Sequence, residues 1–293
     1  MSLIKVNAID DLLGDASGRF FGEIYRKARQ KSFLQVTLLE ESMWSIVGSA
    51  DVDYLANWGA RKGVNRIPHL STIDAVVFLD HVGNYIEEII CAEGKMVAMN
   101  HVLLRAGSAP DEILDGVSVS GKIIDRGGSF HAEIRIGNMR AASDYIISEE
   151  GKDLKSTRIS SCLTPKVSLS NVVVDSSSSR ACADIGLTES QMRLSGGVSI
   201  ITNIVACSQV AQALIAALDD IPRQESNTLW MRKYEAWIPD SSDVKSEEKS
   251  EVIIDDHRVL SVGETKFSIF NGQATGCHVD CHFSLAHALL EGR

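Results

Sequence analysis

The chain has 293 residues, of which 44% are hydrophobic and 23% are charged, and its formal net charge at pH 7 is −10. This composition is typical of a folded globular protein and excludes a disordered, collagen-like or disulfide-built chain. The acidic balance, without a cluster of Lys and Arg, also argues against a nucleic-acid-binding protein. At about 150 residues per domain, the length predicts two domains or one large one.

The N-terminal residues predict a cytoplasmic protein. The segment Met1–Asp11 has one lysine and lacks the apolar run of about 7–15 residues that a secretory signal requires. The cysteines are scattered without a CxxC pair, as expected for reduced thiols. One uncharged segment, Val198–Leu218, has about the length of a membrane-spanning helix. Its polar residues favour a buried core helix instead, so we expect no membrane association.

The first half of the chain predicts strands on both sides of one apolar helix. The segment Leu34–Leu38 alternates apolar with polar residues, as a half-buried strand does. The helix is expected at Ser71–Glu87. A hairpin turn is expected at Gly137-Asn138. The strand-like segments that follow the helix are Val97–Asp111, Phe130–Ile136 and Met139–Ile147.

The second half repeats this pattern. The apolar segment Ser199–Ile215 aligns with Ser71–Glu87, and the polar positions of the two segments coincide. The dipeptide Asn271-Gly272 is a strong signal for a hairpin turn. The strand-like segments of this half are Val167–Leu169, Asn227–Asp240, Lys266–Phe270 and Gln273–Leu285.

A sheet curled around one long apolar helix is the hot-dog layout, in which the helix buries its faces against the concave sheet. The repeat therefore predicts an α+β fold of the tandem (double) hot-dog type. We expect two antiparallel sheets, each wrapped around a long central helix, that join as one continuous sheet. The halves are assigned to residues 1–150 and 151–293, with the junction in the polar segment Glu149–Ser160. The polar segment Ser241–Glu251 is interpreted as a loop.

Three segments carry a resemblance to a known family: Asp10–Arg26, Arg66–Val77 and Leu103–Glu112. In this order they resemble the avirulence protein D family of plant-associated bacteria. The resemblance implies an enzyme involved in making syringolides, which are acyl-sugar elicitors assembled from a β-ketoacyl thioester and a pentulose. γ-Butyrolactone synthases carry out a similar reaction, in which a β-ketoacyl thioester is joined to a three-carbon sugar phosphate. The resemblance does not supply catalytic residues, so the candidate site rests on chemistry.

The start of the first helix is the best candidate for the reactive site, because a helix N-terminus can polarise a thioester carbonyl. His69 precedes this helix and is a candidate base. Asp74, in the first turn, is a second catalytic candidate, which could orient the imidazole or act as a second acid or base. A carboxylate at this position is also favourable through the helix dipole alone. Asp80 and His81, further along the helix, are candidate substrate-binding residues, or a polar pair at a sheet edge.

The second helix has no carboxylate or histidine, since His69 aligns with Gly197 and Asp74 with Thr202. We expect this helix to supply neutral hydrogen-bonding groups, namely Asn203, Gln209 and Gln212, that orient a polyhydroxylated substrate. Arg105, at the end of a strand, is either a phosphate-binding residue or simply exposed.

The most metal-like segment is Cys277–His282, which alternates cysteine and histidine. Strand alternation places its thiols on an apolar face and its histidines on a polar face, and this explains every residue without a metal. The pair Gly196-Gly197 lacks the GxGxxG context of a nucleotide site. We therefore expect neither a metal nor another cofactor.

The leading functional prediction is an enzyme that joins a β-ketoacyl thioester, carried by coenzyme A or a carrier protein, to a ketose such as D-xylulose. His69 would be the base in this reaction. A hot-dog dehydratase or thioesterase is the second possibility, and a non-catalytic acyl-binding or host-interacting module is the third. The expected partners are the thioester and the sugar, together with a possible second copy of the chain.

Overall fold

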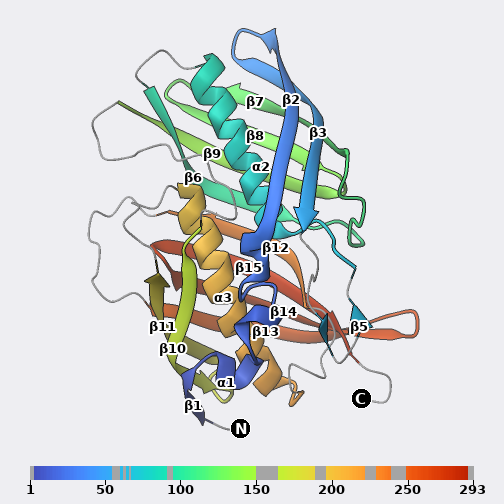
Figure 1. Cartoon of the computed structure of the whole chain (residues 1–293), viewed down its shortest axis with the longest axis vertical. Coiled ribbons are helices and arrows are strands. Elements are labelled where there is room, and N and C mark those ends of the chain that lie inside the picture. The colour runs from blue at the N-terminus through green and yellow to red at the C-terminus, as the bar shows by residue number, and fades with distance from the viewer. Residues whose placement is uncertain are drawn as a thin grey trace.

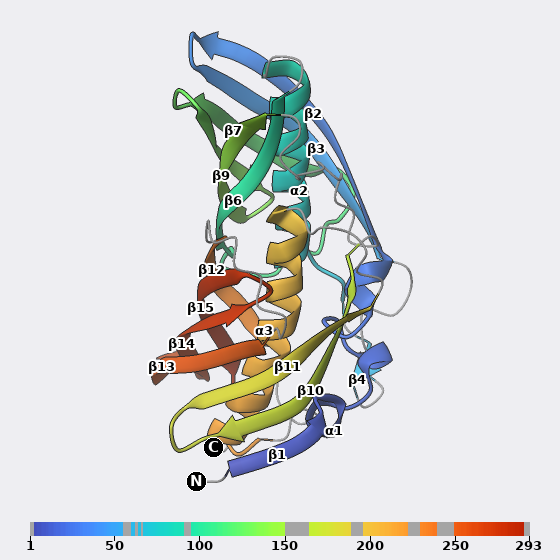
Figure 2. The same ribbon diagram turned by 90° about the vertical axis from the view of Figure 1, so that its left-hand side faces the viewer.

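The computed structural model describes residues 3–54, 60–61, 64–65, 67–90, 95–149, 164–188, 196–221, 229–238 and 249–289. Two long helices lie one above the other on the same side of a large sheet (Figure 1). The turned view shows the sheet curling around both helices (Figure 2). The expected α+β class, with antiparallel strands around apolar helices, is confirmed.

The first half contributes one long helix and six strands of the large sheet. The helix α2 spans Thr72–Tyr85 and continues into a π-helical turn at Ile86–Ile90. These six strands are β2 (Ala28–Glu40), β3 (Met43–Tyr54), β6 (Lys95–Arg105), β7 (Val117–Asp125), β8 (Ser129–Ile136) and β9 (Met139–Glu149). The two short strands, β4 (Ala60–Arg61) and β5 (Val64–Asn65), pair only with each other.

The second half contributes the longer helix α3 (Gly196–Leu218) and six strands. These strands are β10 (Lys166–Asp175), β11 (Arg180–Thr188), β12 (Trp230–Trp237), β13 (Lys249–Val262), β14 (Thr265–Gly276) and β15 (Val279–Ala288). Before β2, the chain forms β1 (Leu3–Ala8), the short helix α1 (Asp10–Leu13) and 3-10 turns at Ala16–Gly18 and Ile24–Lys27.

Thirteen strands form one sheet in the order β1-β10-β11-β13-β14-β15-β12-β6-β9-β8-β7-β3-β2. The halves meet where β12 pairs antiparallel with β6, in a register that sets Lys233 opposite Arg105. In the described part of the chain, the sheets of the two halves therefore join as one continuous sheet, because their edge strands hydrogen-bond to each other. The expected junction at Glu149–Ser160 lies almost entirely outside the described residues, as does most of the expected loop Ser241–Glu251.

The first strand does not stay with its own half. β1 pairs antiparallel with β10, with Ile4 opposite Val174 and Val6 opposite Val172. Helix α1 follows it directly and packs against α3. The N-terminal residues thus complete the sheet around the second helix.

Both helices are central core elements. In α2, Ile73, Val76 and Leu79 are almost completely buried, and in α3 so are Ile204 and Val210. In the part of the chain that the structure describes, one helix segment, Val198–Leu218 of α3, is long and apolar enough to span a membrane, and most of it is buried inside the protein. This burial agrees with its interpretation as a core helix.

One of the two expected hairpin turns is confirmed and the other is wrong. β8 ends at Ile136 and β9 begins at Met139, so Gly137-Asn138 is a turn. By contrast, β14 runs straight through Asn271-Gly272. Gly272 lies in close contact with the β13 backbone, where a Cβ atom would stand 2.3 Å from the carbonyl oxygen of Ile253. The glycine therefore serves close strand packing here, and the chain turns later.

Candidate active site

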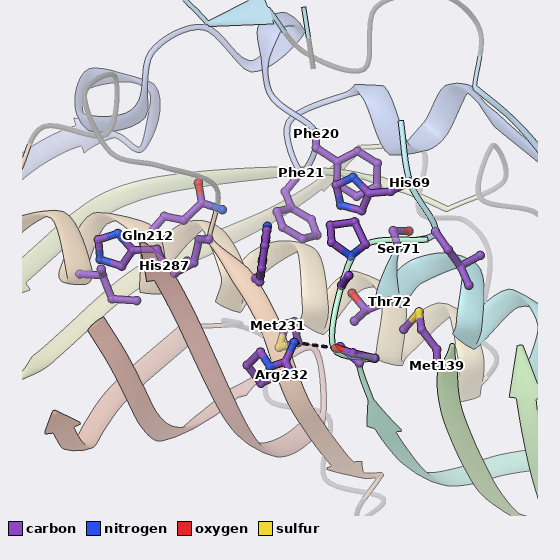
Figure 3. Close-up of a pocket in the computed structure, with 18 of the residues that line it drawn as sticks. Phe20, Phe21, His69, Ser71, Thr72, Met139, Gln212, Met231, Arg232 and His287 are labelled. Atoms are coloured by element: carbon purple, nitrogen blue, oxygen red, sulfur yellow. Dashed lines mark hydrogen bonds between the residues drawn. The ribbon is translucent and has the colours of Figure 1, made fainter. Parts of the chain in front are cut away.

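A cavity of about 170 Å³ lies between the start of α2 and the second half of α3 (Figure 3). Segments far apart in the chain line it, including the turns after α1, the loop after β6, the β8–β9 turn, the start of β12 and the end of β15. Apolar side chains form much of its wall, among them Phe20, Phe21, Leu70, Met139, Leu229 and Met231. Polar side chains line it near each of the two helices, and Asp111, Asn138 and Arg232 line it as well.

The α2 end of the cavity contains the expected base. His69 is half-buried in the cavity wall, and its Nδ1 lies 3.3 Å from the carbonyl oxygen of Ile67. Ser71 and Thr72, the first residues of α2, also line the cavity. The N-terminal end of the helix dipole therefore faces the cavity beside an imidazole, as the sequence led us to expect.

Asp74 lies behind this end of the cavity and is completely buried. It forms a capping box with Ser71: the Ser71 hydroxyl accepts from the Asp74 amide, and the Asp74 carboxylate accepts from the Ser71 amide at 2.8 Å. The carboxylate also accepts from Gln30 at 2.8 Å and from the Tyr54 hydroxyl. Burial raises the pKa of Asp74, and the hydrogen bonds from Gln30, Tyr54 and Ser71 oppose this rise. Asp74 thus fixes the start of α2 but is not among the cavity-lining residues.

The α3 end of the cavity contains a buried arginine. Arg19 is 4% exposed, donates from Nη1 to Oε1 of Gln209 at 2.7 Å, and pairs with Asp10. Burial lowers the pKa of Arg19, and the charge of Asp10 counteracts the effect. Gln209 also donates to the carbonyl oxygen of Val205 within α3. Gln209, an expected substrate-binding residue, therefore lines the cavity as a partner of Arg19.

A histidine–aspartate pair completes this end. His287 on β15 is 3% exposed, and its Nε2 lies 2.6 Å from Oδ2 of Asp219, which directly follows α3. Both residues line the cavity. The other carboxylate oxygen, Oδ1, accepts from Ser268 at 3.4 Å. Within the described residues, Nδ1 of His287 has no hydrogen-bond partner.

Asn203 is buried away from the cavity. Its Nδ2 donates to the carbonyl oxygens of Gly276 at 2.8 Å and Val279 at 3.1 Å, and its Oδ1 accepts from the Tyr234 hydroxyl at 2.7 Å. Burial raises the pKa of Tyr234 well above its usual value, so the phenol stays a neutral donor. Asn203 therefore connects α3 to the turn between β14 and β15.

Three further candidates also lie outside the cavity lining. His81 is half-buried, and its Nδ1 lies 2.8 Å from the hydroxyl of Ser32 on β2. Asp80, its neighbour on α2, is half-buried too. Arg105 is exposed at the end of β6. Of the candidate residues, the structure brings His69, Gln209 and Gln212 to one cavity.

The segment Cys277–His282 forms a tight turn followed by a strand. Cys277 and His278 both have positive φ, at 56° and 57°, and connect β14 to β15. Val279 and Cys281 are buried, whereas His278 and His282 are exposed. Among the described residues, no three His, Cys, Asp or Glu side chains are placed to hold a metal ion.

The sequence as a whole matches one known family. The family described as Pseudomonas avirulence D protein (AvrD) matches residues 5–145 and 163–289, which is nearly the whole chain. The chain belongs to the AvrD family. The resemblance noted in three short segments is therefore confirmed over both halves. A search of curated proteins found no match.

Solved structures similar to this AvrD-family chain include a TesB protein and a dehydratase domain. The TesB protein of Mycobacterium avium subsp. paratuberculosis has a TM-score of 0.47 and 9% identity, covering 87% of this chain and 96% of that one. The dehydratase domain of PpsC from Mycobacterium tuberculosis, solved with C12:1-CoA, has a TM-score of 0.41 and 8% identity, covering 89% and 98%. A hot-dog protein of unknown function from Alicyclobacillus acidocaldarius has a TM-score of 0.40 and 6% identity, covering 92% and 98%.

Sequence reasoning missed three residues of the AvrD-family cavity, although each left a signal. Arg19 lies in the first segment that carried the family resemblance. Asp219 is the first charge after the long uncharged helix. His287 continues the alternation of buried residues in β15, after Phe283 and Leu285. Extending that alternation to the end of the strand would have placed a histidine on the inner face.

Proposed function

We propose that this AvrD-family chain is an enzyme that joins a β-ketoacyl thioester to a ketose such as D-xylulose, giving an acyl-sugar precursor of the syringolide type. One observation carries the proposal: a mostly apolar cavity has polar side chains near each of the two helices, α2 and α3. A reaction between an acyl thioester and a sugar needs both substrates in one cavity, each held by different chemistry. The family membership supports the same reaction.

In this proposal the acyl group lies against the apolar wall that includes Phe20, Phe21 and Met139, with its thioester carbonyl near the start of α2. The helix dipole stabilises the negative charge that develops on the carbonyl oxygen during attack. His69 acts as a base, either on the activated C–H between the two carbonyls or on a hydroxyl of the ketose. Asp74 holds the first turn of α2 in place for this purpose.

The α3 end supplies hydrogen bonds to the sugar, with Gln209 as a direct contact. Asn203 supports this end from behind by fixing the β14–β15 turn. The proposal gives Asp80, His81 and Arg105 no contact with either substrate. We also propose that the chain is a double hot-dog with halves at residues 1–150 and 151–293, acts in the cytoplasm without a cofactor, and pairs as a homodimer.

The test is an assay of purified protein with a β-ketoacyl thioester, with and without D-xylulose, read by mass spectrometry. We expect an acyl-sugar product only when both substrates are present. His69→Ala should lower the rate about 10²–10⁴-fold, as expected when a general base is lost. His282→Ala is the matched control, because His282 is exposed on β15. Hydrolysis or dehydration of the thioester without sugar would instead support a thioesterase or dehydratase, and binding without turnover would support an acyl-binding module.

A further inference from the structure

The His287–Asp219 pair has no role in the reaction as described above. Its position at the α3 end of the cavity is unusual on structural grounds. Asp219 directly follows the C-terminus of α3, where the helix dipole disfavours a negative charge. Nδ1 of His287 is buried and, within the described residues, unpartnered, which is also unfavourable. Unfavourable features that persist together in a cavity wall indicate a functional group.

The contacts around the pair orient the imidazole and determine which ring nitrogen faces Asp219. A carboxylate can only accept, so the 2.6 Å contact between Oδ2 of Asp219 and Nε2 of His287 requires the proton on Nε2. Nδ1 then carries a lone pair that can accept a proton. Oδ1 of Asp219 lies 3.4 Å from the Ser268 hydroxyl and 3.6 Å from Nε2 of His257, which itself lies 2.7 Å from that hydroxyl. The ring of Phe270 stacks on His287 with an interplanar angle of 11° and centroids 6.1 Å apart. The carboxylate and the ring are therefore both oriented, as in a base positioned by an acid.

The charges that line the cavity favour an uncharged ligand. Two arginines, Arg19 and Arg232, line it together with two aspartates, Asp111 and Asp219. Arg19 also pairs with Asp10, and Arg232 donates to the carbonyl oxygen of Gly107 at 2.7 Å. The arginines and aspartates in the lining are equal in number, so they leave no net positive charge for a phosphate. Hydroxyl groups, which donate and accept, suit the amide of Gln209 and the Nδ1 lone pair.

Resting on the proposed function, we propose that the α3 end of the cavity binds an unphosphorylated polyhydroxylated acceptor and that His287, positioned by Asp219, takes the proton from its attacking hydroxyl. The oxygen of that hydroxyl forms a bond to the thioester carbonyl carbon, and the carbon–sulfur bond breaks. The leaving thiolate takes the proton back from His287, so an ester and a thiol are produced and the imidazole returns to its neutral form. The role of His69 is then to take the proton from the activated C–H of the β-ketoacyl group.

The experiment compares acyl transfer to D-xylulose and to D-xylulose 5-phosphate, in the wild type and in His287→Gln, Asp219→Asn and His282→Gln. Glutamine can keep a hydrogen bond to Asp219 but cannot act as a base. We expect His287→Gln and Asp219→Asn to lower kcat about 10²–10⁴-fold. The KM for the thioester should change less than about threefold, because the acyl group binds elsewhere. His282→Gln should match the wild type, and the wild type should prefer the unphosphorylated ketose.

The possible failures are distinguishable. A wild type that makes no acyl-sugar overturns the proposed function and this inference together. A wild type that makes it, with a folded His287→Gln variant within about threefold of its kcat, overturns only the role of His287. Preference for D-xylulose 5-phosphate overturns the uncharged acceptor. This last comparison uses the wild type alone, so it tests the charge of the acceptor even where a variant does not fold.

Discussion

The hydrogen bonds of Asn203 make a quantitative prediction, since its side chain is completely buried and bonded on every side. Asn203→Ala leaves the Tyr234 hydroxyl and the carbonyl oxygens of Gly276 and Val279 without their partner. Each buried polar group that loses its partner costs about 1–3 kcal/mol. The tyrosine hydroxyl keeps only the weakly hydrogen-bonding thiol of Cys281, whereas the carbonyl oxygens keep a second lone pair. We therefore expect a total loss of about 3–6 kcal/mol in the free energy of unfolding.

Urea unfolding, followed by circular dichroism, measures this loss through the midpoint and the slope. Tyr234→Phe should cost about 1–3 kcal/mol by itself, because it leaves one acceptor of Asn203 unpaired. The double variant should cost less than the sum, since both changes remove the same bond. Asn271→Ala is the control: its hydrogen bond to Asp256 is exposed, and we expect a loss below about 1 kcal/mol. A loss of about 1 kcal/mol or less for Asn203→Ala would refute this reasoning.

Three further predictions concern the cap, the sheet and a turn. Ser71→Ala removes the N-cap of α2 and a donor to buried Asp74, so the free energy of unfolding should fall by about 2 kcal/mol in urea melts; a loss no larger than that of exposed Ser45→Ala would contradict it. Gly272→Ala places a Cβ 2.3 Å from the carbonyl oxygen of Ile253, so overpacking should cost about 1–3 kcal/mol by the same assay, and an unchanged midpoint would exclude it. Hydrogen bonds from Ser177 and Ser178 lower the pKa of Asp175 from 3.8 to about 2. Its stabilisation is therefore complete above pH 3.8 and disappears toward pH 2, so the difference in urea midpoint between wild type and Asp175→Ala should shrink over that range; a constant difference would argue against this linkage.

The helices and many strands were predictable because their signals are local. The apolar segment at the start of α2 and the alternation of Phe130–Ile136 each reflect the period of one element packed against one core. The Gly137-Asn138 turn followed in the same way, since the turn residues themselves carry the geometry. The structure agrees at all these points.

The prediction of a hairpin turn at Asn271-Gly272 was wrong because these two residues serve contacts with a neighbouring strand and not a turn. Gly272 is required by the neighbouring β13 backbone, and Asn271 donates to Asp256 across the strands. The true turn uses Cys277 and His278 in a left-handed conformation that is uncommon for residues other than glycine. A sequence pattern carries no information about which strand will lie alongside, so the two uses of glycine look the same.

The sequence indicated the α2 end of the cavity and the glutamines of α3, but not the residues that meet those glutamines. His69 and the start of α2 are neighbours in the chain, so a local pattern places them together. Arg19, Gln209 and His287 come from three distant parts of the chain and meet only after the sheet has closed. Their shared chemistry depends on strand order, which the sequence repeat does not encode.

The pairing of β1 with β10 has a consequence for the order in which the molecule can be built. Leu3 lies opposite Asp175, so the first strand leaves the ribosome well before its partner has been made. At about 5–20 residues per second, the delay amounts to roughly 10–30 s. During this time the N-terminal strand has no native neighbour, and Arg19 has no Gln209 to bind. Chaperones that bind exposed apolar segments therefore have a defined interval in which to act on the newly made chain.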